Sequence, residues 1–319
     1  MEINSNCTED TISNAAKALK EGHLVAFPTE TVYGLGADAT SEKAVSRIYS
    51  VKERPTDHPL IVHISSMHKL QDWAIDLPDY AIKLARNFWP GPMTLILPRT
   101  ELAKDFITGG QNNVGLRVPD QPIALALLRK FEELGGKGIA APSANKFGAV
   151  SPTTSEAVQE ELAKFLVPDD LVIDGGPCQI GIESTIIDCT RLLPKILRPG
   201  AITKEMVETT IEMKIERENL MLTPRASGMM KSHYSPKAKV SFNNKTTEGD
   251  GFIALANVPT PPGALRLGSP QTTKQFARDI YNLLRLGDSK GLAKITVILP
   301  TSGELLEAIT DRVAKASAG

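Results

Sequence analysis

Hydrophobic residues follow one another at two different spacings along this chain. A spacing of three to four residues, as at Ile12, Ala15, Ala16 and Leu19, predicts a helix that buries one face. Gly22 follows this run, and glycine commonly ends a helix. The same reasoning predicts helices over residues 8–21, 41–53, 79–88, 122–134, 154–166, 203–211, 272–286 and 303–316.

Shorter apolar runs, bounded by proline, glycine or polar residues, predict buried strands. They cover residues 24–27, 59–64, 93–98, 114–119, 138–145, 171–176, 183–190 and 195–200, followed late in the chain by AKVSF, GFIALA and ITVILP. Strands and helices do not alternate strictly, since 93–98 and 114–119 are joined without a clear helix. The pattern favours an α/β fold of the α+β kind, with a twisted mixed β-sheet and flanking helices, over a doubly wound parallel sheet.

The length of 319 residues favours two domains over one core. Residues 214–236 differ from their surroundings, because they are charged at first and then rich in Pro, Gly, Ser and Met. We interpret this stretch as a linker. The sequence therefore predicts a first, larger domain over 8–203, a linker over 204–236 and a smaller C-terminal β/α Rossmann-like domain over 237–319.

Composition narrows the class of protein. Hydrophobic residues make up 41% and charged residues 23%, as in ordinary soluble globular proteins, and no apolar run reaches the length of a membrane span. The polar, acidic start MEINSNCTED fits neither a secretory nor a mitochondrial signal. Three cysteines without C-x-x-C spacing argue against a disulfide framework and a zinc site, and favour a cytoplasmic protein. Of these, Cys178 is better explained as a small packing residue than as a nucleophile.

Charge is uneven between the two predicted domains. Residues 1–201 carry 20 Lys and Arg against 25 Asp and Glu, whereas residues 202–319 carry 16 against 12. Neither balance is that of a dedicated nucleic-acid-binding protein, although a structured RNA could still be contacted transiently.

The stretch FPTETVYGLGADAT, residues 27–40, follows an apolar strand with hydroxyls, a carboxylate and glycines. Such polar groups are costly to bury without partners, so we interpret the stretch as the floor of a binding site. Its G-x-G-x-x-A pattern lacks the tight strand–turn–helix of a dinucleotide site, and the next strand ends without an acidic residue to hold a ribose. A P-loop motif is also absent from the sequence.

A second stretch, VKERPTDHPLIVHI, gathers Lys52, Arg54, His58 and His63 at the end of a helix and along the next strand. Lys52 could simply complement the helix dipole. Arg54 precedes a proline that fixes the loop, and a rigid loop that presents Arg and Lys suits a polyphosphate.

Two further stretches carry candidate ligand groups. Ser143, Asn145 and Ser151 lie in AAPSANKFGAVSPTT, which is either a loop that approaches a ligand or a set of ordinary Asx and Ser turns. Arg117 interrupts an apolar strand and needs a partner, which is either a bound anion or an internal Asp or Glu. Polar residues also stand at the ends of two late strands, namely Glu183, Ser184, Thr185 and Arg198.

Taken together, these stretches resemble a known family. FPTETVYGLGADA, K-x-R-P-x-x-H-P-L-I-V-H, WPGPMTLIL, VGLRVPD, APSAN…SPT, IESTIID and LRPGAIT occur in the order found in the YrdC-like threonylcarbamoyl-AMP synthases. The resemblance covers residues 12–203, and GMMKSHYSP with the region after it resembles the longer, two-domain members.

The resemblance implies an L-threonylcarbamoyladenylate synthase, a nucleotidyltransferase of the tRNA-processing pathway. L-threonine and bicarbonate would give a carbamate whose carboxylate attacks the α-phosphorus of ATP, with Mg²⁺ assisting and pyrophosphate leaving. A partner, the tRNA-threonylcarbamoyl transferase machinery, would then modify tRNAs that read codons beginning with A.

The resemblance also implies roles for individual residues. Threonine would contact Thr31, His63, Arg117, Ala141 and Ser184. ATP would contact Arg54, His58, Asn113, Ser143, Ser151, Arg198 and Tyr234, with Lys52, Arg54, Ser143 and Asn145 as the catalytic group. His233 and Tyr234 would close over the site as a lid. The sequence departs from many members at His58, where lysine or asparagine is common, and at Ser232, which precedes His233.

Two other functions use the same residues. A double-stranded RNA-binding module would use the basic side chains as phosphate contacts on a concave sheet. A carbamoyl-transferring maturation enzyme would carry zinc fingers beside a YrdC-like domain, but paired cysteines are missing here.

Overall fold

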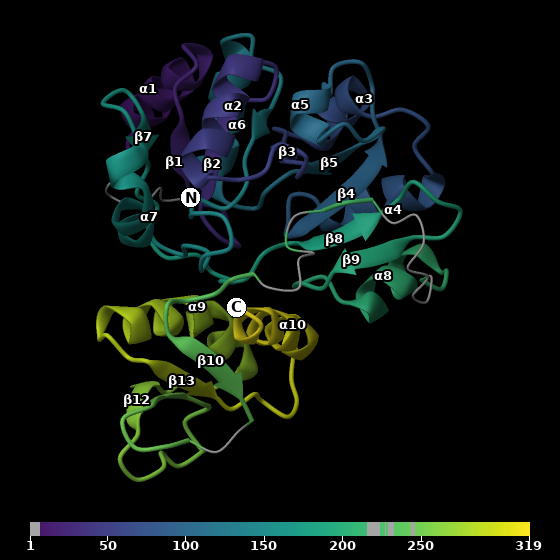
Figure 1. The fold of residues 1–319 in the computed structure, drawn as a ribbon. Coiled ribbons are helices and arrows are strands. Elements are labelled where there is room, and N and C mark those ends of the chain that lie inside the picture. Colours follow the sequence, from purple (N-terminus) through teal and green to yellow (C-terminus); the bar gives the residue numbers. More distant parts are fainter. Residues whose placement is uncertain (1–6, 216–223, 227, 229–232, 244–245) are drawn as a thin grey trace.

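The computed structural model describes residues 7–215, 224–226, 228, 233–243 and 246–319, and they form two β-sheets covered by helices (Figure 1). The larger sheet has nine strands in the order β7-β1-β2-β6-β3-β5-β4-β8-β9. Its strands are β1 (Val25–Phe27), β2 (Gly34–Asp38), β3 (Ile61–His63), β4 (Met93–Pro98), β5 (Asn113–Arg117), β6 (Ile139–Ala140), β7 (Leu171–Val172), β8 (Thr185–Asp188) and β9 (Lys195–Arg198).

Parallel and antiparallel pairs are mixed in this sheet. β3 runs parallel to β5, and β4 runs parallel to β8, whereas β4 and β5 are antiparallel. The prediction of a twisted mixed sheet is therefore confirmed.

Helices flank the larger sheet. They are α1 (Glu9–Lys20), α2 (Glu42–Lys52), α3 (Leu70–Trp73), α4 (Asp79–Phe88), α5 (Asp105–Thr108), α6 (Pro122–Glu133), α7 (Ser155–Leu162) and α8 (Lys204–Ile211), with 3-10 turns η1 (Met67–Lys69) and η2 (Ala163–Phe165). Hydroxyl side chains cap several of the predicted helices, as Thr8 caps α1 and Ser41 caps α2. α1 packs on α6, and α8 packs on α4.

The smaller sheet is entirely parallel, in the order β10-β13-β11-β12. It contains β10 (Lys239–Phe242), β11 (Gly251–Ile253), β12 (Leu265–Gly268) and β13 (Lys294–Val297), with helices α9 (Thr273–Ser289) and α10 (Leu306–Ser317). Figure 1 shows both helices between this sheet and the rest of the molecule. We call residues 237–319 the C-terminal domain, and they form a second β/α unit.

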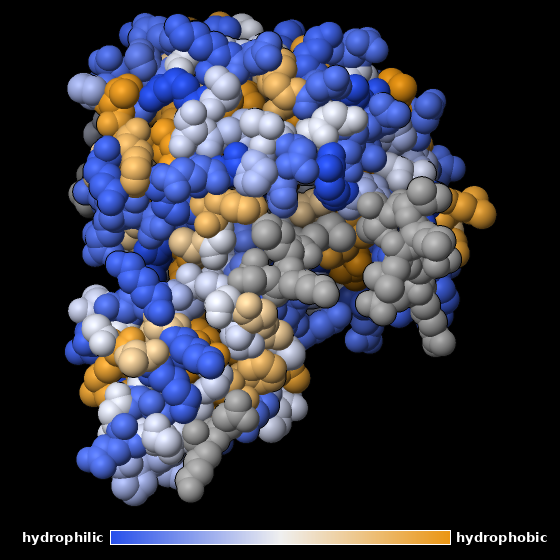
Figure 2. Space-filling model, viewed as in Figure 1, coloured by the Kyte–Doolittle hydropathy of each residue, from blue (hydrophilic) through white to orange (hydrophobic). Residues whose placement is uncertain are grey.

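The two parts share one hydrophobic cluster. Val32, Val150 and Ile182 of the first part pack with Phe276 and Ile280 of α9. In Figure 2 the outer surface is mainly hydrophilic, and hydrophobic residues are frequent along the junction. The C-terminal domain is therefore docked through a core, which holds α9 and α10 in fixed positions beside the first domain.

Gly181 lets the two parts approach closely. Its φ is +81°, and a Cβ on this residue would lie 2.4 Å from the Cα and carbonyl oxygen of Arg278 in α9. Two polar contacts cross nearby, because Thr153 donates a hydrogen bond to Asn282 and Arg285 forms an ion pair with Glu161.

Two strands were not predicted. β2 covers GLGAD within the stretch that we interpreted as the floor of a binding site, and all five of its residues are buried. A Cβ on Gly36 would lie 2.7 Å from Ile139 and 2.8 Å from Phe27, so this strand needs glycine for close packing and not for a turn. β12 is the other missed strand. Part of the predicted linker, including Ser232, lies outside the described residues.

None of the described helices is long and apolar enough to cross a membrane. The three cysteines are buried and free.

Candidate active site

A cavity of about 50 Å³ lies where strand ends of the large sheet meet the segment around Tyr234. Most of the predicted site residues line it, namely Thr31, Lys52, Arg54, His63, Arg117, Ala141, Ser143, Asn145, Ser184, Arg198, His233 and Tyr234. The cavity therefore brings together residues that the sequence places on many different elements.

Element ends explain this convergence. Lys52 ends α2, His63 ends β3 and Arg117 ends β5. His63 and Arg117 are register partners in the parallel pair β3–β5, so their side chains reach the same edge of the sheet. The other residues follow or precede strands in the same way, as Ser143 and Asn145 follow β6, Ser184 precedes β8 and Arg198 ends β9.

Lys52 is fixed at one side of the cavity. Its side chain is 2% exposed, and its ammonium donates hydrogen bonds to the carbonyl oxygens of Ser143, at 2.6 Å, and Asn145. Burial lowers the pKa of Lys52 well below its usual value, and the charge of Arg54 adds to this effect. The lysine therefore ties the Ser143–Asn145 loop to the end of α2.

Two arginines accompany it. Arg54 donates to the carbonyl oxygen of Pro59 at 3.0 Å and lies 5.5 Å above the ring of Phe147. Burial lowers its pKa to about 10, so the guanidinium stays charged at neutral pH. Arg198 donates to the carbonyl and hydroxyl oxygens of Ser184 at 3.0 and 3.1 Å. Three cations thus stand around one small space, an arrangement that attracts polyanions.

The opposite side holds a buried ion pair. Arg117 and Glu30 approach to 2.7 Å, and their side chains are 5% and 4% exposed. The approach lies off the hydrogen-bond directions, since both Glu30 oxygens and Nε and Nη2 of Arg117 are buried without a hydrogen-bond partner. The pair therefore keeps capacity for a ligand that has both charged and polar groups.

His63 lies beside this pair. Burial, with a further contribution from the charge of Arg117, lowers the pKa of His63 to about 3. The imidazole is neutral at pH 7, and its Nδ1 is buried without a partner. Thr31 completes this side, and its hydroxyl lies 2.8 Å from that of Thr29.

His233 and Tyr234 line the cavity from the segment that follows β9 and α8 in the chain. Their ring centroids are 4.3 Å apart, and the Tyr234 hydroxyl is buried without a hydrogen-bond partner. Tyr234 has a φ of +63°, a left-handed conformation that non-glycine residues adopt only when packing enforces it. The cavity volume of about 50 Å³ is far below the ~300 Å³ or more of typical ligand pockets.

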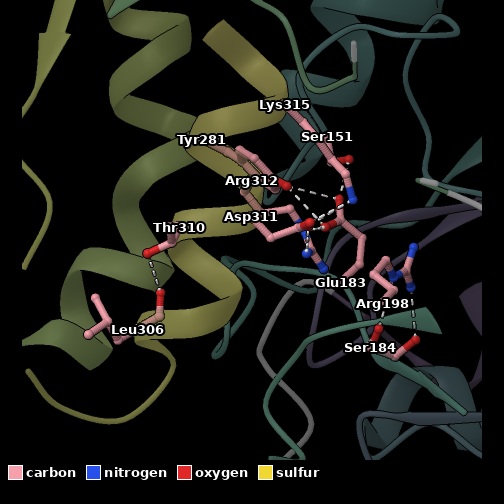
Figure 3. Close-up of polar contacts among 10 residues, drawn as sticks. All are labelled: Ser151, Glu183, Ser184, Arg198, Tyr281, Leu306, Thr310, Asp311, Arg312 and Lys315. Atoms are coloured by element: carbon pink, nitrogen blue, oxygen red, sulfur yellow. Dashed lines mark hydrogen bonds and ion pairs between the residues drawn. The ribbon is translucent and has the colours of Figure 1, made fainter. Parts of the chain in front are cut away.

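Glu183 connects the cavity to the C-terminal domain (Figure 3). Its carboxylate accepts hydrogen bonds from Ser151 at 2.6 Å, Tyr281 of α9 at 3.0 Å and Arg312 of α10 at 2.8 Å. Burial opposes ionisation of Glu183, but the charges of Arg312 and Arg198 outweigh it and hold its pKa at about 2. Glu183 is therefore ionised throughout the physiological range.

The structure places three predicted residues away from the cavity wall. His58 packs edge-on against Phe147, at 5.2 Å between ring centroids. Asn113 lines a small neighbouring groove with Gly115 and Ala226. Ser151 lies behind the wall, on Glu183.

Sequence reasoning also missed contributors to this region. Glu30 and Glu183 were noted as carboxylates within polar stretches, but their partners were not identified. Tyr281, Arg312 and Phe147 carried no recognisable signal, because their proximity to the site depends on the tertiary fold alone.

Two family models match the chain, and the boundary between them lies after the last strand of the larger sheet and before the first strand of the smaller one. The Sua5/YciO/YrdC family model, described as telomere recombination, matches residues 17–200. The model of the threonylcarbamoyl-AMP synthase C-terminal domain matches residues 202–318.

Curated proteins give a concordant result. The chain is 45% identical over 244 residues to the threonylcarbamoyl-AMP synthase of Pyrococcus abyssi, which covers 75% of this chain and 70% of that protein. It is 43% identical over 247 residues to the threonylcarbamoyl-AMP synthase of Bacillus subtilis, with 76% and 68% covered.

Solved structures share the entire two-domain arrangement. P. abyssi Sua5 in complex with L-threonine has a TM-score of 0.87 and 38% identity, covering 97% of this chain and 95% of that one. A P. abyssi Sua5 variant in which a histidine and the following tyrosine are replaced by alanine has a TM-score of 0.88 and 37% identity, with 99% and 95% covered.

Proposed function

The chain belongs to the Sua5/YciO/YrdC family and carries the C-terminal domain of the threonylcarbamoyl-AMP synthases, and we propose that it forms threonylcarbamoyl-AMP and pyrophosphate from L-threonine, bicarbonate and ATP. The observation that carries this proposal is the shared cavity. Three buried cations line it together with a neutral histidine and with Arg117, which pairs with the buried Glu30. Relatives named threonylcarbamoyl-AMP synthase, and a threonine complex of P. abyssi Sua5, support it.

The reaction needs positioning more than a protein nucleophile. The threonine amine first forms a bond to the carbon of bicarbonate, and a carbon–oxygen bond breaks as water leaves, which gives a carbamate. A carbamate oxygen then forms a bond to the α-phosphorus, and the bond from the α-phosphorus to the bridging oxygen breaks as pyrophosphate leaves with that oxygen. The attacking group belongs to the substrate, and burial raises the pKa of Cys178 so that its thiol stays protonated.

We assign the cationic side of the cavity to the triphosphate. Negative charge increases on the phosphoryl and leaving oxygens during attack, and Lys52, Arg54 and Arg198 are held in fixed positions to stabilise it. Because these cations are already oriented by carbonyl oxygens, they need little rearrangement when charge develops.

We assign the other side to threonine. Arg117 would receive its carboxylate, with Thr31, Ala141 and Ser184 at the border. Neutral His63 can accept or donate a hydrogen bond without adding charge beside Arg117. Arg117 therefore has a ligand role as well as its internal carboxylate, Glu30.

Magnesium is expected to enter with ATP. Asn145 offers a hard, buried amide oxygen without a hydrogen-bond partner, which fits Mg²⁺, an ion that usually binds few protein groups in addition to phosphates and water. When bound, the ion would neutralise phosphate charge. Among the described residues, three or more His, Cys, Asp or Glu do not gather as a separate metal site.

We further propose that the product passes to a tRNA-threonylcarbamoyl transferase machinery for tRNAs that read codons beginning with A. A mixed anhydride is labile in water, so a lid formed by His233 and Tyr234 would protect it until transfer. Transient contact with tRNA fits this sequence of steps.

Double-stranded RNA binding receives no support from the position of these cations. Lys52 is 2% and Arg54 is 7% exposed, so neither presents its charge to the backbone of a duplex.

The test is to incubate the protein with ATP, Mg²⁺, bicarbonate and single amino acids, and to detect carbamoyl adenylates by mass. We expect threonylcarbamoyl-AMP to form only when ATP, threonine and bicarbonate are all present. Omission of bicarbonate is the matched control. Formation of plain threonyl-AMP, or of no adenylate at all, would contradict the proposal.

A further inference from the structure

We propose that Arg312 of the C-terminal domain is a positioning residue for ATP binding, because it holds the Glu183 carboxylate away from Arg198 and packs against Tyr234. This inference rests on the proposed function, which assigns Arg198 and Tyr234 to the nucleotide. It gives the C-terminal domain a specific task within the active site.

The first line of support is the Glu183 cluster (Figure 3). Arg312 is 1% exposed, and its Nε forms an ion pair with Glu183 at 2.8 Å. Its Nη1 contacts Asp311 at 2.5 Å, and Lys315 contacts the same Asp311 at 2.7 Å. A buried arginine requires such partners. Here Glu183 is one of them, so its carboxylate is oriented toward Arg312.

The second line of support is the position of Arg198. Ser184, the residue after Glu183, accepts both hydrogen bonds described above from Arg198. The Arg198 charge is close enough to stabilise ionised Glu183. If Arg312 were removed, the carboxylate would keep Arg198 as its strongest cationic neighbour, and pairing between them would compete with the ATP phosphates.

The third line of support is Tyr234. The Arg312 guanidinium lies 5.3 Å from the Tyr234 ring centroid. The rings of Tyr281 and Tyr234 are stacked, with 5.7 Å between their centroids and 28° between their planes. The backbone N–H of His233 donates to the carbonyl oxygen of Lys315 at 3.3 Å. Helices α9 and α10 therefore enforce the left-handed conformation of Tyr234, which its backbone does not favour.

The competing explanation is that Arg312 only holds the two domains together. A substitution of Arg285 distinguishes this explanation from a positioning role. Arg285 on α9 also joins the domains, through Glu161 at 3.0 Å and the carbonyl oxygen of Val150. These partners lie on α7 and on the loop before it, and within the described part of the chain Arg285 makes no hydrogen bond or ion pair with Glu183 or Tyr234. Arg285→Met is thus a control for the loss of an interdomain arginine and its ion pair.

The experiment compares full-length wild type, Arg312→Met, Arg285→Met and the double variant Glu183→Gln/Arg312→Met. Titration calorimetry measures the Kd of a non-hydrolysable ATP analogue and, separately, of L-threonine. We expect Arg312→Met to weaken binding of the analogue about tenfold or more, with threonine changed by less than about twofold. Arg285→Met should stay within about twofold for both, and the double variant should recover most of the ATP affinity, because a neutral glutamine no longer competes for Arg198.

Three results would overturn the proposal: unchanged ATP affinity in Arg312→Met, an equal loss in Arg285→Met, or no recovery in the double variant. If Arg312→Met does not fold, Arg312→Lys replaces it. A loss of ATP affinity that Glu183→Gln restores then supports the proposal, and an unchanged affinity overturns it.

The wild-type chain separates this inference from the proposed function. If wild type binds the ATP analogue but forms no threonylcarbamoyl-AMP, the proposed function fails. The comparison of ATP affinities among the variants still decides the role of Arg312.

Discussion

The cavity of the first domain and the interior of the C-terminal domain treat buried polar atoms in opposite ways. Around the cavity, buried atoms of Glu30, His63, Arg117, Asn145 and Tyr234 have no hydrogen-bond partner. In the described part of residues 237–319, such atoms belong only to Arg285 and Arg312, which both face the first domain.

The interior of the C-terminal domain satisfies its polar groups instead. Thr273 donates to the carbonyl oxygen of Ser302 at 2.7 Å, and Asp250 accepts from Thr247 and Lys294, both at 2.8 Å. A buried polar atom without a partner costs about 1–3 kcal/mol. The cavity region therefore gives up folding stability to keep polar atoms available for ligands. The interior of the C-terminal domain uses its polar groups to stabilise the fold.

The largest effect on activity is expected from one of two arginines that make similar contacts, one in each domain. Arg54 and Arg266 each lie 5.5 Å above a phenylalanine ring and donate to backbone carbonyl oxygens, but only Arg54 lines the cavity. We expect Arg54→Ala to lower threonine- and bicarbonate-dependent pyrophosphate release about a thousandfold, or about 4 kcal/mol. Arg266→Ala should lower the melting temperature and leave the rate of the folded enzyme near wild type.

Steady-state release of pyrophosphate and thermal unfolding of both variants decide the matter. Near-normal turnover in Arg54→Ala would show that the phosphate assignment is wrong.

A core substitution should have the reverse profile. Leu284 of α9 is 1% exposed in the hydrophobic cluster of the C-terminal domain. Leu284→Ala should lower the free energy of unfolding by about 3 kcal/mol through lost burial and a residual cavity. Urea denaturation measures this loss, and KM for threonine should be unchanged where the variant is folded. A raised KM for threonine without loss of stability would remove the distinction between the two regions.

Acid should weaken the two regions unequally. All five histidines precede residue 237, and burial is the main cause that lowers the pKa of both His63 and His233 to about 3. Above pH 6.5 these histidines are neutral whether folded or unfolded. As the pH falls below 6.5 the unfolded chain binds protons that the folded chain excludes, so folding loses about 2 kcal/mol per histidine at pH 5.

Urea denaturation at pH 7.5 and pH 5 tests this expectation. The variants His63→Asn and His233→Asn should each lose a share of the difference between the two pH values. A stability difference that is the same in wild type and both variants would show that these histidines are not the source.

The smallest effect concerns helix starts, where the two regions should not differ. Thr8 caps α1 and Thr272 caps α9, each through a hydrogen bond from the N–H three residues later. Thr8→Ala and Thr272→Ala should each lower the free energy of unfolding by about 1 kcal/mol without changing the kinetics. A change in KM for ATP in either variant would indicate that helix ends and the site are coupled.

Short-range patterns explain which features of the fold were predictable. The sequence predicted α2 because Ser41 and an apolar face at Ala44, Val45 and Ile48 act within one helix. β2 was missed because Gly34–Asp38 has weak strand propensity, and it becomes a strand only when neighbouring strands pack on its glycines.

The same limit applies to the site. The motifs identified Lys52, Arg54 and Arg117, since each is anomalous in its own segment. The ion partner of Arg117 could be predicted only as some carboxylate or ligand, and Glu30 emerges as that partner from the fold. Arg312 lies in an ordinary amphipathic helix, so its contact with Glu183 depends on how the two domains dock.

Gly181 gives this molecule an unusual weak point. The chain passes flush against α9 there because residue 181 has only hydrogen where others have carbon. A methyl group on residue 181, two positions before Glu183, would push α9 away from the first domain. The Tyr281 hydroxyl would then move away from the Glu183 carboxylate. The packing between the first domain and α9 at residue 181 therefore has no room for even one additional carbon atom.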